Sequence, residues 1–256
     1  MIGIFDSGSG GMSVAKELLR LLPGEQYVYY ADNAHCPYGE KSPEYIRERA
    51  RAITDELRSR GCSIIVVACN TATAAAIATL REEYPDIPFI GMEPAVKPAA
   101  LGTRSGVIGV LATAGTLKGS KYLNTKGKYS EGICVEEHVG EGFVELVEQG
   151  ILSGERAEET VRRSLQPLLD EGADTIVLGC THYPFLEEVI RKIAGPGVRI
   201  IDPAPSVALR TEQVMRERGI LSPEARSIPK EPRITLLSSG APDSLERIWS
   251  VVRAYL

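Results

Sequence analysis

Short apolar runs alternate with amphipathic stretches along almost the whole chain. The apolar runs are rich in Ile and Val, which is typical of strands buried on both faces of a parallel sheet. The stretches between them repeat apolar residues at helical spacing, so the pattern predicts parallel α/β units. The predicted strands are Ile2–Phe5, Tyr27–Ala31, Ser63–Ala68, Phe89–Met92, Val107–Leu111, Ile133–Glu137, Thr175–Gly179, Arg199–Ile201 and Ile234–Leu237. The predicted helices are Met12–Leu22, Pro43–Ser59, Thr71–Glu83, Gly142–Gln149, Glu155–Glu171, Pro184–Ile193, Ser206–Arg218 and Asp243–Ala254.

The number of predicted strands favours two α/β lobes over one small sheet. Two proline-rich stretches interrupt the alternation, at Glu93–Pro98 and at Asp202–Pro205. Proline ends helices and is excluded from central strands, so these stretches are the best candidates for boundaries between lobes. We therefore expect boundaries near residues 94 and 205.

Two of the apolar runs end in a cysteine. Cys69 follows Ile64–Ala68 and comes just before an alanine-rich helical pattern, and Cys180 follows Thr175–Gly179 and comes before the helical pattern at Pro184–Ile190. Each thiol should therefore lie at the carboxyl end of a buried strand, where open α/β sheets bind ligands. The amino end of a helix also favours a thiolate over a thiol. The likeness of the two segments supports two related lobes, each with one cysteine.

The composition is that of an ordinary globular chain, with 43% hydrophobic residues and a net charge of −5. This mildly acidic balance, without a block of Lys and Arg, argues against nucleic acid or an anionic membrane as a partner. No apolar run approaches the ~20 residues that cross a bilayer, and the start lacks the features of a signal peptide. The five cysteines form no CxxC pair or zinc-binding spacing, so we expect no metal and a reducing cytoplasm.

Three further segments carry polar groups at candidate positions. Asp6 ends the first strand before a glycine-rich turn, where it either caps the turn or lies in the site. Tyr38-Gly39 offers a hydroxyl and an N–H to a ligand, or forms an ordinary tight turn. His182 either exchanges protons beside Cys180 or caps a helix. The remaining cysteines are expected to be structural or incidental, and they are Cys36, Cys62 and Cys134.

Two opposed thiols suit the removal of a proton from one face of a carbon and the return of a proton to the other. One thiolate and one thiol supply a base and an acid without metal or organic cofactor. A hydrolase or acyltransferase built on Cys180 and His182 is an alternative, which gives Cys69 no role. A ligand-binding regulator without turnover is another, whereas a redox dithiol is disfavoured because the cysteines belong to separate units.

The motifs resemble those of the glutamate racemases, in the aspartate/glutamate racemase superfamily, over essentially the whole chain. The matching stretches are Ile4–Gly11, Pro37–Gly39, Ala68–Ala72, Leu111–Thr116 and Gly179–Pro184. Racemases for aspartate are the nearest alternative, but His182-Tyr183-Pro184 favours glutamate. One departure is Glu145, which stands where many members have proline, so the local geometry before Glu148 is open.

The resemblance implies an α/β fold of two pseudosymmetric open lobes with mainly parallel sheets and an active site in the cleft between them. The lobes would be residues 1–94 plus 205–256, and residues 95–204. It also implies cofactor-independent interconversion of L- and D-glutamate for peptidoglycan synthesis, by a cytoplasmic homodimer. Because the first strand begins at Ile2, with no N-terminal extension, we expect no activation by a peptidoglycan precursor.

The same resemblance implies roles for particular residues. Cys69 would deprotonate D-glutamate and Cys180 would deprotonate L-glutamate, with Asp6, His182 and Glu148 assisting. The implied substrate-binding residues are Asp6, Ser7, Tyr38, Gly39, Asn70, Thr71, Thr113, Thr116, Thr181 and His182.

Overall fold

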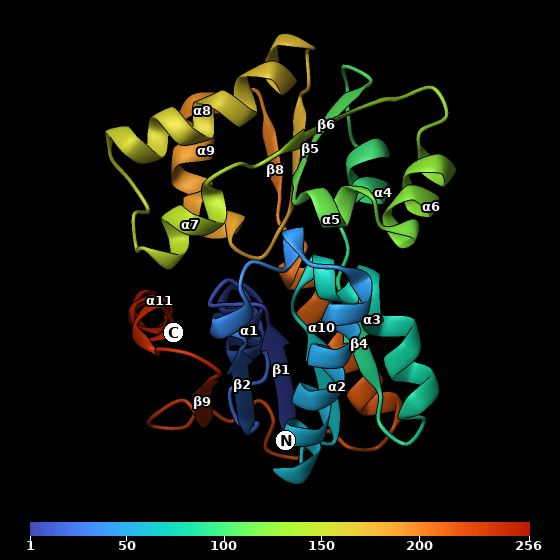
Figure 1. Cartoon of the computed structure of the whole chain (residues 1–256), viewed down its shortest axis with the longest axis vertical. Helices are drawn as coiled ribbons and strands as arrows, with labels where there is room; N and C mark the ends of the chain where they lie inside the picture. The colour runs from blue at the N-terminus through green and yellow to red at the C-terminus, as the bar shows by residue number, and fades with distance from the viewer.

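The computed structural model describes residues 1–256 and contains two separate sheets, one above the other in Figure 1. Every pair of neighbouring strands is parallel. The first sheet has the order β4-β3-β1-β2-β9, built from β1 (Ile2–Asp6), β2 (Tyr27–Ala31), β3 (Ile64–Val67), β4 (Phe89–Gly91) and β9 (Ile234–Ser238). The second has the order β6-β5-β7-β8, built from β5 (Val107–Ala112), β6 (Cys134–Val139), β7 (Thr175–Gly179) and β8 (Arg199–Ile201). All nine predicted strands are confirmed, each within two residues of its expected bounds.

The two sheets repeat one topology. Numbered in chain order within its own sheet, the first four strands of each sheet lie side by side as fourth, third, first and second. The expected pseudosymmetry is therefore present at the level of strand order, with β9 added only to the first sheet. The strands of the first sheet come from residues 2–91 and 234–238, and those of the second from residues 107–201. The lobe boundaries near residues 94 and 205 stay a prediction.

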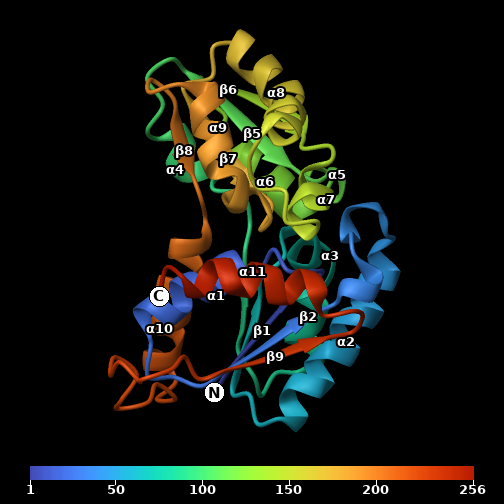
Figure 2. The same ribbon diagram turned by 90° about the vertical axis from the view of Figure 1, so that its left-hand side faces the viewer.

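Helices cover both faces of each sheet (Figures 1 and 2). On the first sheet, α1 (Met12–Leu21), α10 (Ala204–Glu217) and α11 (Asp243–Arg253) pack on one face, and α2 (Pro43–Ser59) and α3 (Asn70–Glu83) pack on the other. On the second sheet, α7 (Phe143–Glu148), α8 (Glu155–Asp170) and α9 (Glu187–Ala194) oppose α4 (Val96–Ala100) and α6 (Ser120–Tyr129). The short α5 (Ala114–Leu117) and the 3-10 turns η1 (Asn33–His35), η2 (Tyr38–Glu40) and η3 (Tyr183–Leu186) complete the chain.

The alternation of side chains along the strands explains this layering. In β1, Ile4 packs under α1, whereas the next residue, Phe5, packs under α2 and α3. Strands β1, β3 and β7 are buried along their whole length, which matches their continuous apolar sequences. A fully buried side chain of this kind stabilises the fold by about 1.5–3 kcal/mol. No helix combines the length and the apolar character that a bilayer crossing requires.

Seven of the predicted helices form as α-helices, and the eighth begins as the 3-10 turn η3 before it continues as α9. Helix α4 was not predicted, because it begins inside the proline-rich stretch at residue 96. Its Pro98 lies in the first turn, where a backbone N–H has no helical partner and proline is tolerated. Helix α6 was not predicted either. Only Tyr122 of its ten residues is buried, so it has no apolar stripe to reveal it.

Candidate active site

Both cysteines that were singled out lie at the carboxyl ends of corresponding strands. Cys69 follows β3 and Cys180 follows β7, and each of these is the third strand of its sheet. Cys69 caps α3, because its Sγ accepts the N–H of Ala72 at 3.4 Å. Cys180 lies just before η3. Both side chains are buried, with Cys69 5% exposed and Cys180 8% exposed.

The Asp6 carboxylate joins the glycine-rich turn to the second lobe. Its Oδ2 accepts the N–H groups of Gly8 and Gly11, both at 3.1 Å, and its Oδ1 accepts the Thr181 hydroxyl at 3.3 Å. Complete burial raises the pKa of Asp6, although the charge of His182 and the two backbone bonds oppose the effect. Asp6 therefore caps the turn and also lies at the junction with the segment that follows Cys180.

The surroundings of Cys69 correct one expectation. Its thiol contacts the Ser7 hydroxyl, with 3.8 Å between Sγ and Oγ, and lies beside Asp6. Burial raises the pKa of the Cys69 thiol, and the Asp6 carboxylate raises it further. The expected lowering by the start of α3 is wrong here. The hydrogen bonds with Ala72 and Ser7 lower the pKa, but the loss of hydration outweighs them.

His182 forms a hydrogen-bonded chain with groups from both lobes. Its Nδ1 lies 3.7 Å from Cys180 Sγ, and its Nε2 lies 2.7 Å from Glu148 Oε1. The same carboxylate oxygen accepts the N–H of Ser9 at 2.7 Å and its hydroxyl at 2.9 Å. The imidazole lies against Gly10, where any side chain would collide with the ring. Close approach of the two lobes at this point therefore requires glycine.

The positive charge of His182 and the negative charge of Glu148 stabilise each other. Burial disfavours the charged imidazole, but hydrogen bonds with Cys180 and Glu148 outweigh it and raise the pKa of His182 well above its ordinary value. Burial also opposes ionisation of Glu148, but the hydrogen bond and the charge of His182 lower its pKa to about 2. An imidazolium held by a carboxylate can donate a proton toward Cys180 and recover it.

A second cluster of polar groups lies beside the first lobe's cysteine. The hydroxyls of Thr71, Thr113 and Thr116 are 2.9–3.3 Å apart and come from both lobes. The Asn70 side chain is 4% exposed, and neither its Nδ2 nor its Oδ1 has a hydrogen-bond partner. A buried amide without partners costs about 1–3 kcal/mol, so this arrangement suits a ligand that would satisfy it.

Tyr38 and Gly39 occupy different environments. The Tyr38 hydroxyl donates to Asp32 Oδ2 at 2.5 Å, and Arg49 binds the same carboxylate with two hydrogen bonds of 2.8 and 2.9 Å. This hydroxyl is therefore engaged within the protein, whereas Gly39 lies against Thr113 of the second lobe. Sequence reasoning missed Asp32 and Arg49, because their ion pair joins α2 to a loop 17 residues earlier in the chain.

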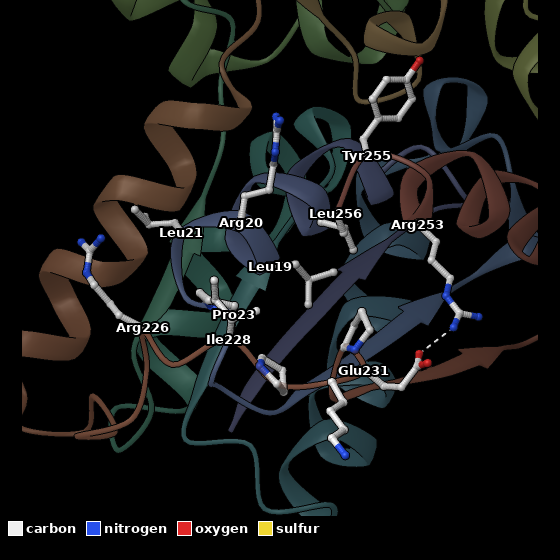
Figure 3. A pocket seen from close by; sticks show the side chains of 13 residues that line it. Leu19, Arg20, Leu21, Pro23, Arg226, Ile228, Glu231, Arg253, Tyr255 and Leu256 are labelled. Atoms are coloured by element: carbon white, nitrogen blue, oxygen red, sulfur yellow. Dashed lines mark hydrogen bonds and ion pairs between the residues drawn. The ribbon is translucent and has the colours of Figure 1, made fainter.

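Little of either thiol is open to solvent, because both cysteine side chains are buried. A cavity of ≈ 740 Å³ lies away from them, between the end of α1 and the chain terminus, with Arg20, Arg253 and Tyr255 among its lining residues (Figure 3). A ligand that reaches the buried thiols therefore requires the lobes to move apart.

The comparisons with known proteins agree with this fold. Residues 2–211 match the family model described as Asp/Glu/Hydantoin racemase. Glutamate racemase from Roseiflexus sp. (strain RS-1) is 52% identical over 220 residues, which is 86% of this chain and 81% of that protein. The structure of Escherichia coli glutamate racemase in complex with L-glutamate and the activator UDP-MurNAc-ala matches with a TM-score of 0.85 and 35% identity, over 99% of this chain and 94% of that chain. The Francisella tularensis enzyme in complex with D-glutamate matches with a TM-score of 0.83 and 30% identity, over 99% and 93%. The chain belongs to the Asp/Glu/hydantoin racemase family, among its glutamate racemases.

Proposed function

We propose that this chain interconverts L- and D-glutamate by a cofactor-independent, two-cysteine mechanism. The observation that carries the proposal is the repeated placement of one buried cysteine after the third strand of each sheet. The two thiols have different proton partners, because Cys69 lies beside Asp6 and Cys180 lies beside His182. That difference suits a pair in which one group accepts a proton while the other donates one.

In the proposed reaction, a thiolate takes the proton from Cα, so that the Cα–H bond breaks and an S–H bond forms. The electron pair left on Cα is delocalised into the substrate carboxylate. The opposite thiol then gives its proton to the other face of Cα, and its own S–H bond breaks. Cys69 would act as base toward D-glutamate and Cys180 toward L-glutamate. The two cysteines exchange protonation states in each turnover.

The raised pKa of Cys69 requires a route by which its thiolate forms. Asp6 is adjacent, its pKa is also raised by burial, and it can accept the thiol proton. A bound substrate brings an ammonium group between the lobes, and this positive charge offsets the repulsion between Asp6 and a Cys69 thiolate. On the other side, His182 and Glu148 form the corresponding relay for Cys180.

The polar groups around the thiols support an amino-acid substrate with two carboxylates. Gly39, Asn70 and the threonine cluster lie on one side, and Ser7 and Thr181 lie near Asp6. Hydroxyl and amide donors of this kind bind carboxylates. We also propose that the product supplies peptidoglycan synthesis in the cytoplasm, that the enzyme is a homodimer, and that the lobes divide near residues 94 and 205.

Proton exchange tests the mechanism directly. L-Glutamate and D-glutamate are incubated separately in D₂O without added cofactor, while optical rotation and deuterium at Cα are followed. We expect deuterium in the newly formed enantiomer, and losses of about 10²–10⁴-fold in rate in both Cys69→Ser and Cys180→Ser. Cys134→Ser is the matched control, because Cys134 is exposed and lies in β6.

The outcomes separate the competing functions. Nearly full activity in Cys69→Ser would indicate a Cys180–His182 nucleophile, which the 3.7 Å contact also permits. Absence of Cα exchange with glutamate would reject that substrate. Exchange with aspartate instead would then indicate a racemase of different specificity, and no exchange with either would indicate a binding protein.

A further inference from the structure

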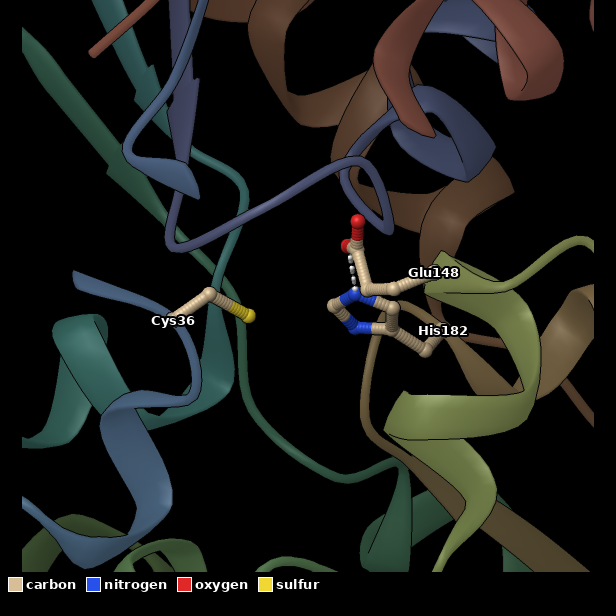
Figure 4. A group of neighbouring side chains, drawn as sticks. All are labelled: Cys36, Glu148 and His182. Carbon is tan, nitrogen blue, oxygen red and sulfur yellow. Dashed lines mark hydrogen bonds and ion pairs between the residues drawn. The ribbon is translucent and has the colours of Figure 1, made fainter. Parts of the chain in front are cut away.

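Cys36 is a third thiol at the junction of the lobes, and the proposed reaction does not use it. It follows η1, on the first lobe, and its side chain points toward the pair formed by Glu148 and His182 (Figure 4). One ligand atom from each of these three residues lies within 4.8 Å of the other two. A nucleophilic sulfur, a carboxylate oxygen and an imidazole nitrogen therefore converge from three segments that are distant in the sequence.

We propose that Cys36, Glu148 and His182 bind a zinc ion that bridges the two lobes. Zinc is bound by thiolate, imidazole and carboxylate ligands, and sites with three protein ligands keep a fourth position for water. Bond lengths of about 2.0–2.3 Å place the ligand atoms roughly 3.3–3.6 Å apart in a tetrahedral site. Cys36 must approach the other two ligands by up to about 1 Å, whereas Glu148 Oε1 and His182 Nε2, now 2.7 Å apart, must separate slightly.

The charge of the site also favours a divalent cation. Zinc binding releases the thiol proton of Cys36 and one proton from His182. The resulting thiolate and the Glu148 carboxylate supply two negative charges and the neutral imidazole supplies none, so the ion and its three ligands carry no net charge. Neutrality matters here because Glu148 is only partly exposed and His182 is buried. Zinc would replace the hydrogen bond between His182 and Glu148 with two metal bonds.

Solvent has a route to these ligands. A cavity of ≈ 390 Å³ has both Cys36 and Glu148 on its wall, together with Ser244 and Arg247 of α11. Arg247 is exposed, so the cavity opens to the surface near the amino end of α11. An ion in this cavity can therefore reach Cys36 and Glu148 without passing the two catalytic thiols.

Zinc binding to the full chain, freed of metal, is measured by isothermal titration calorimetry. We expect one zinc ion per chain for the wild type and for Cys134→Ser, which removes an exposed thiol elsewhere. We expect Cys36→Ser to bind zinc about 100-fold more weakly, whereas Mg²⁺, which prefers oxygen ligands, should not bind the wild type at this site. Equal zinc affinity in Cys36→Ser would reject the proposal.

Cobalt identifies the sulfur ligand. Cys180 is the rival ligand, since its Sγ lies 3.7 Å from His182 Nδ1. We expect the thiolate-to-cobalt charge-transfer band of the wild type to persist in Cys180→Ser and to vanish in Cys36→Ser. The reverse result would place the ion on Cys180 and overturn the assignment.

A third measurement needs no variant. Zinc should slow alkylation of Cys36 in the wild type, as read by peptide mass spectrometry, while the exposed Cys134 reacts at an unchanged rate. Equal rates at Cys36 with and without zinc would contradict the site. None of these readouts depends on glutamate turnover, so failure of the proposed reaction and failure of the metal site remain distinct results.

Discussion

At the scale of single residues, the His182 imidazole is held in a fixed position beside Cys180. It is 1% exposed, its Nε2 is bonded to Glu148, and Gly10 packs against its ring. Glu148 contacts neither cysteine, so its proposed role is to position the imidazole and to keep it charged. Removing that charge tests whether the relay to Cys180 matters.

Glu148→Gln is expected to lower kcat at least tenfold in both directions, with KM changed only slightly, because a positioned acid–base group contributes about 10²–10⁴ to the rate. The pKa of His182 should fall toward its ordinary value, which NMR titration of the ring measures directly. Glu145→Gln is the matched control, since Glu145 is exposed and lies on the same helix. An unchanged kcat together with a lowered His182 pKa would remove the imidazolium from the mechanism.

The positions of the two cysteines could be predicted from the sequence, but the pKa of the Cys69 thiol could not. Cys69 and Cys180 were located because an apolar run ending in cysteine has a local signature. The raised pKa of Cys69 was missed because it depends on burial and on the distance to Asp6, which only the folded chain determines. The bond from the Tyr38 hydroxyl to Asp32 was not predicted for the same reason, because that aspartate is held by Arg49 of a different element; the role of Tyr38 in substrate binding stays a prediction.

At the scale of elements, helix α2 makes two similar ion pairs in different surroundings. Arg49 binds Asp32 with two hydrogen bonds, and Arg51 binds Glu83 in the same way with bonds of 2.7 and 2.8 Å. Asp32 is fully buried, whereas Arg51 and Glu83 are about two-fifths exposed. The pair at Arg49 also fixes the loop that carries Tyr38. Burial should therefore decide which pair stabilises the fold.

Arg49→Met is expected to destabilise the protein by about 3 kcal/mol, because it leaves the buried Asp32 carboxylate without its cation. Arg51→Met, two residues along the same helix, should change the free energy of unfolding by less than about 1 kcal/mol. Urea denaturation of both variants measures the difference. Equal losses of unfolding free energy in the two variants would show that burial of Asp32 does not make the Arg49–Asp32 pair more stabilising than the Arg51–Glu83 pair.

The helices and strands that bury a continuous apolar face were the ones that the sequence predicted. Strands and helices with a continuous or striped apolar pattern were predicted to within a few residues, since their sequence records the face that they bury. Helix α6 was missed because it buries one side chain, and α4 because proline masks its first turn. The meeting of Cys36, Glu148 and His182 was not predicted, because the three residues lie on three segments that are far apart in the sequence.

At the scale of the whole molecule, the two copies of one strand order place equivalent cysteines at facing sheet edges. The segment that leaves β8 and enters α10 is one of the connections between the sheets, and it contains Asp202. Burial raises the pKa of Asp202 to about 6, and Glu187 and Glu17 add to this effect, while the N–H of Ala204 and Lys16 oppose it. A carboxyl group at this connection thus favours its neutral form.

The raised pKa of Asp202 makes the free energy of unfolding depend on pH. Because the pKa of Asp202 rises from 3.8 to about 6 on folding, its stabilising contribution is complete below pH 3.8 and is lost as the pH rises through 6. Asp202→Asn removes the buried charge and keeps an oxygen that can accept the Ala204 N–H. It should therefore stabilise the protein at pH 8 by at most about 3 kcal/mol, with no difference from the wild type near pH 4.

Asp174→Asn provides the opposite control within the same lobe. Its carboxylate accepts the backbone N–H groups of Arg104 and Ser105, at 2.6 and 2.8 Å, and the Thr103 hydroxyl at 2.7 Å. These bonds outweigh burial and lower its pKa to about 2, so its contribution is present above pH 3.8 and is lost as the pH falls toward 2. Asn can accept fewer of these bonds, so the variant should lose about 2 kcal/mol of unfolding free energy at pH 8.

Thermal unfolding of both variants, Asp202→Asn and Asp174→Asn, at pH 4, 6 and 8 measures the two trends. A stability change of the same sign in both variants at pH 8 would show that the charge of Asp202 does not limit the stability of the connection.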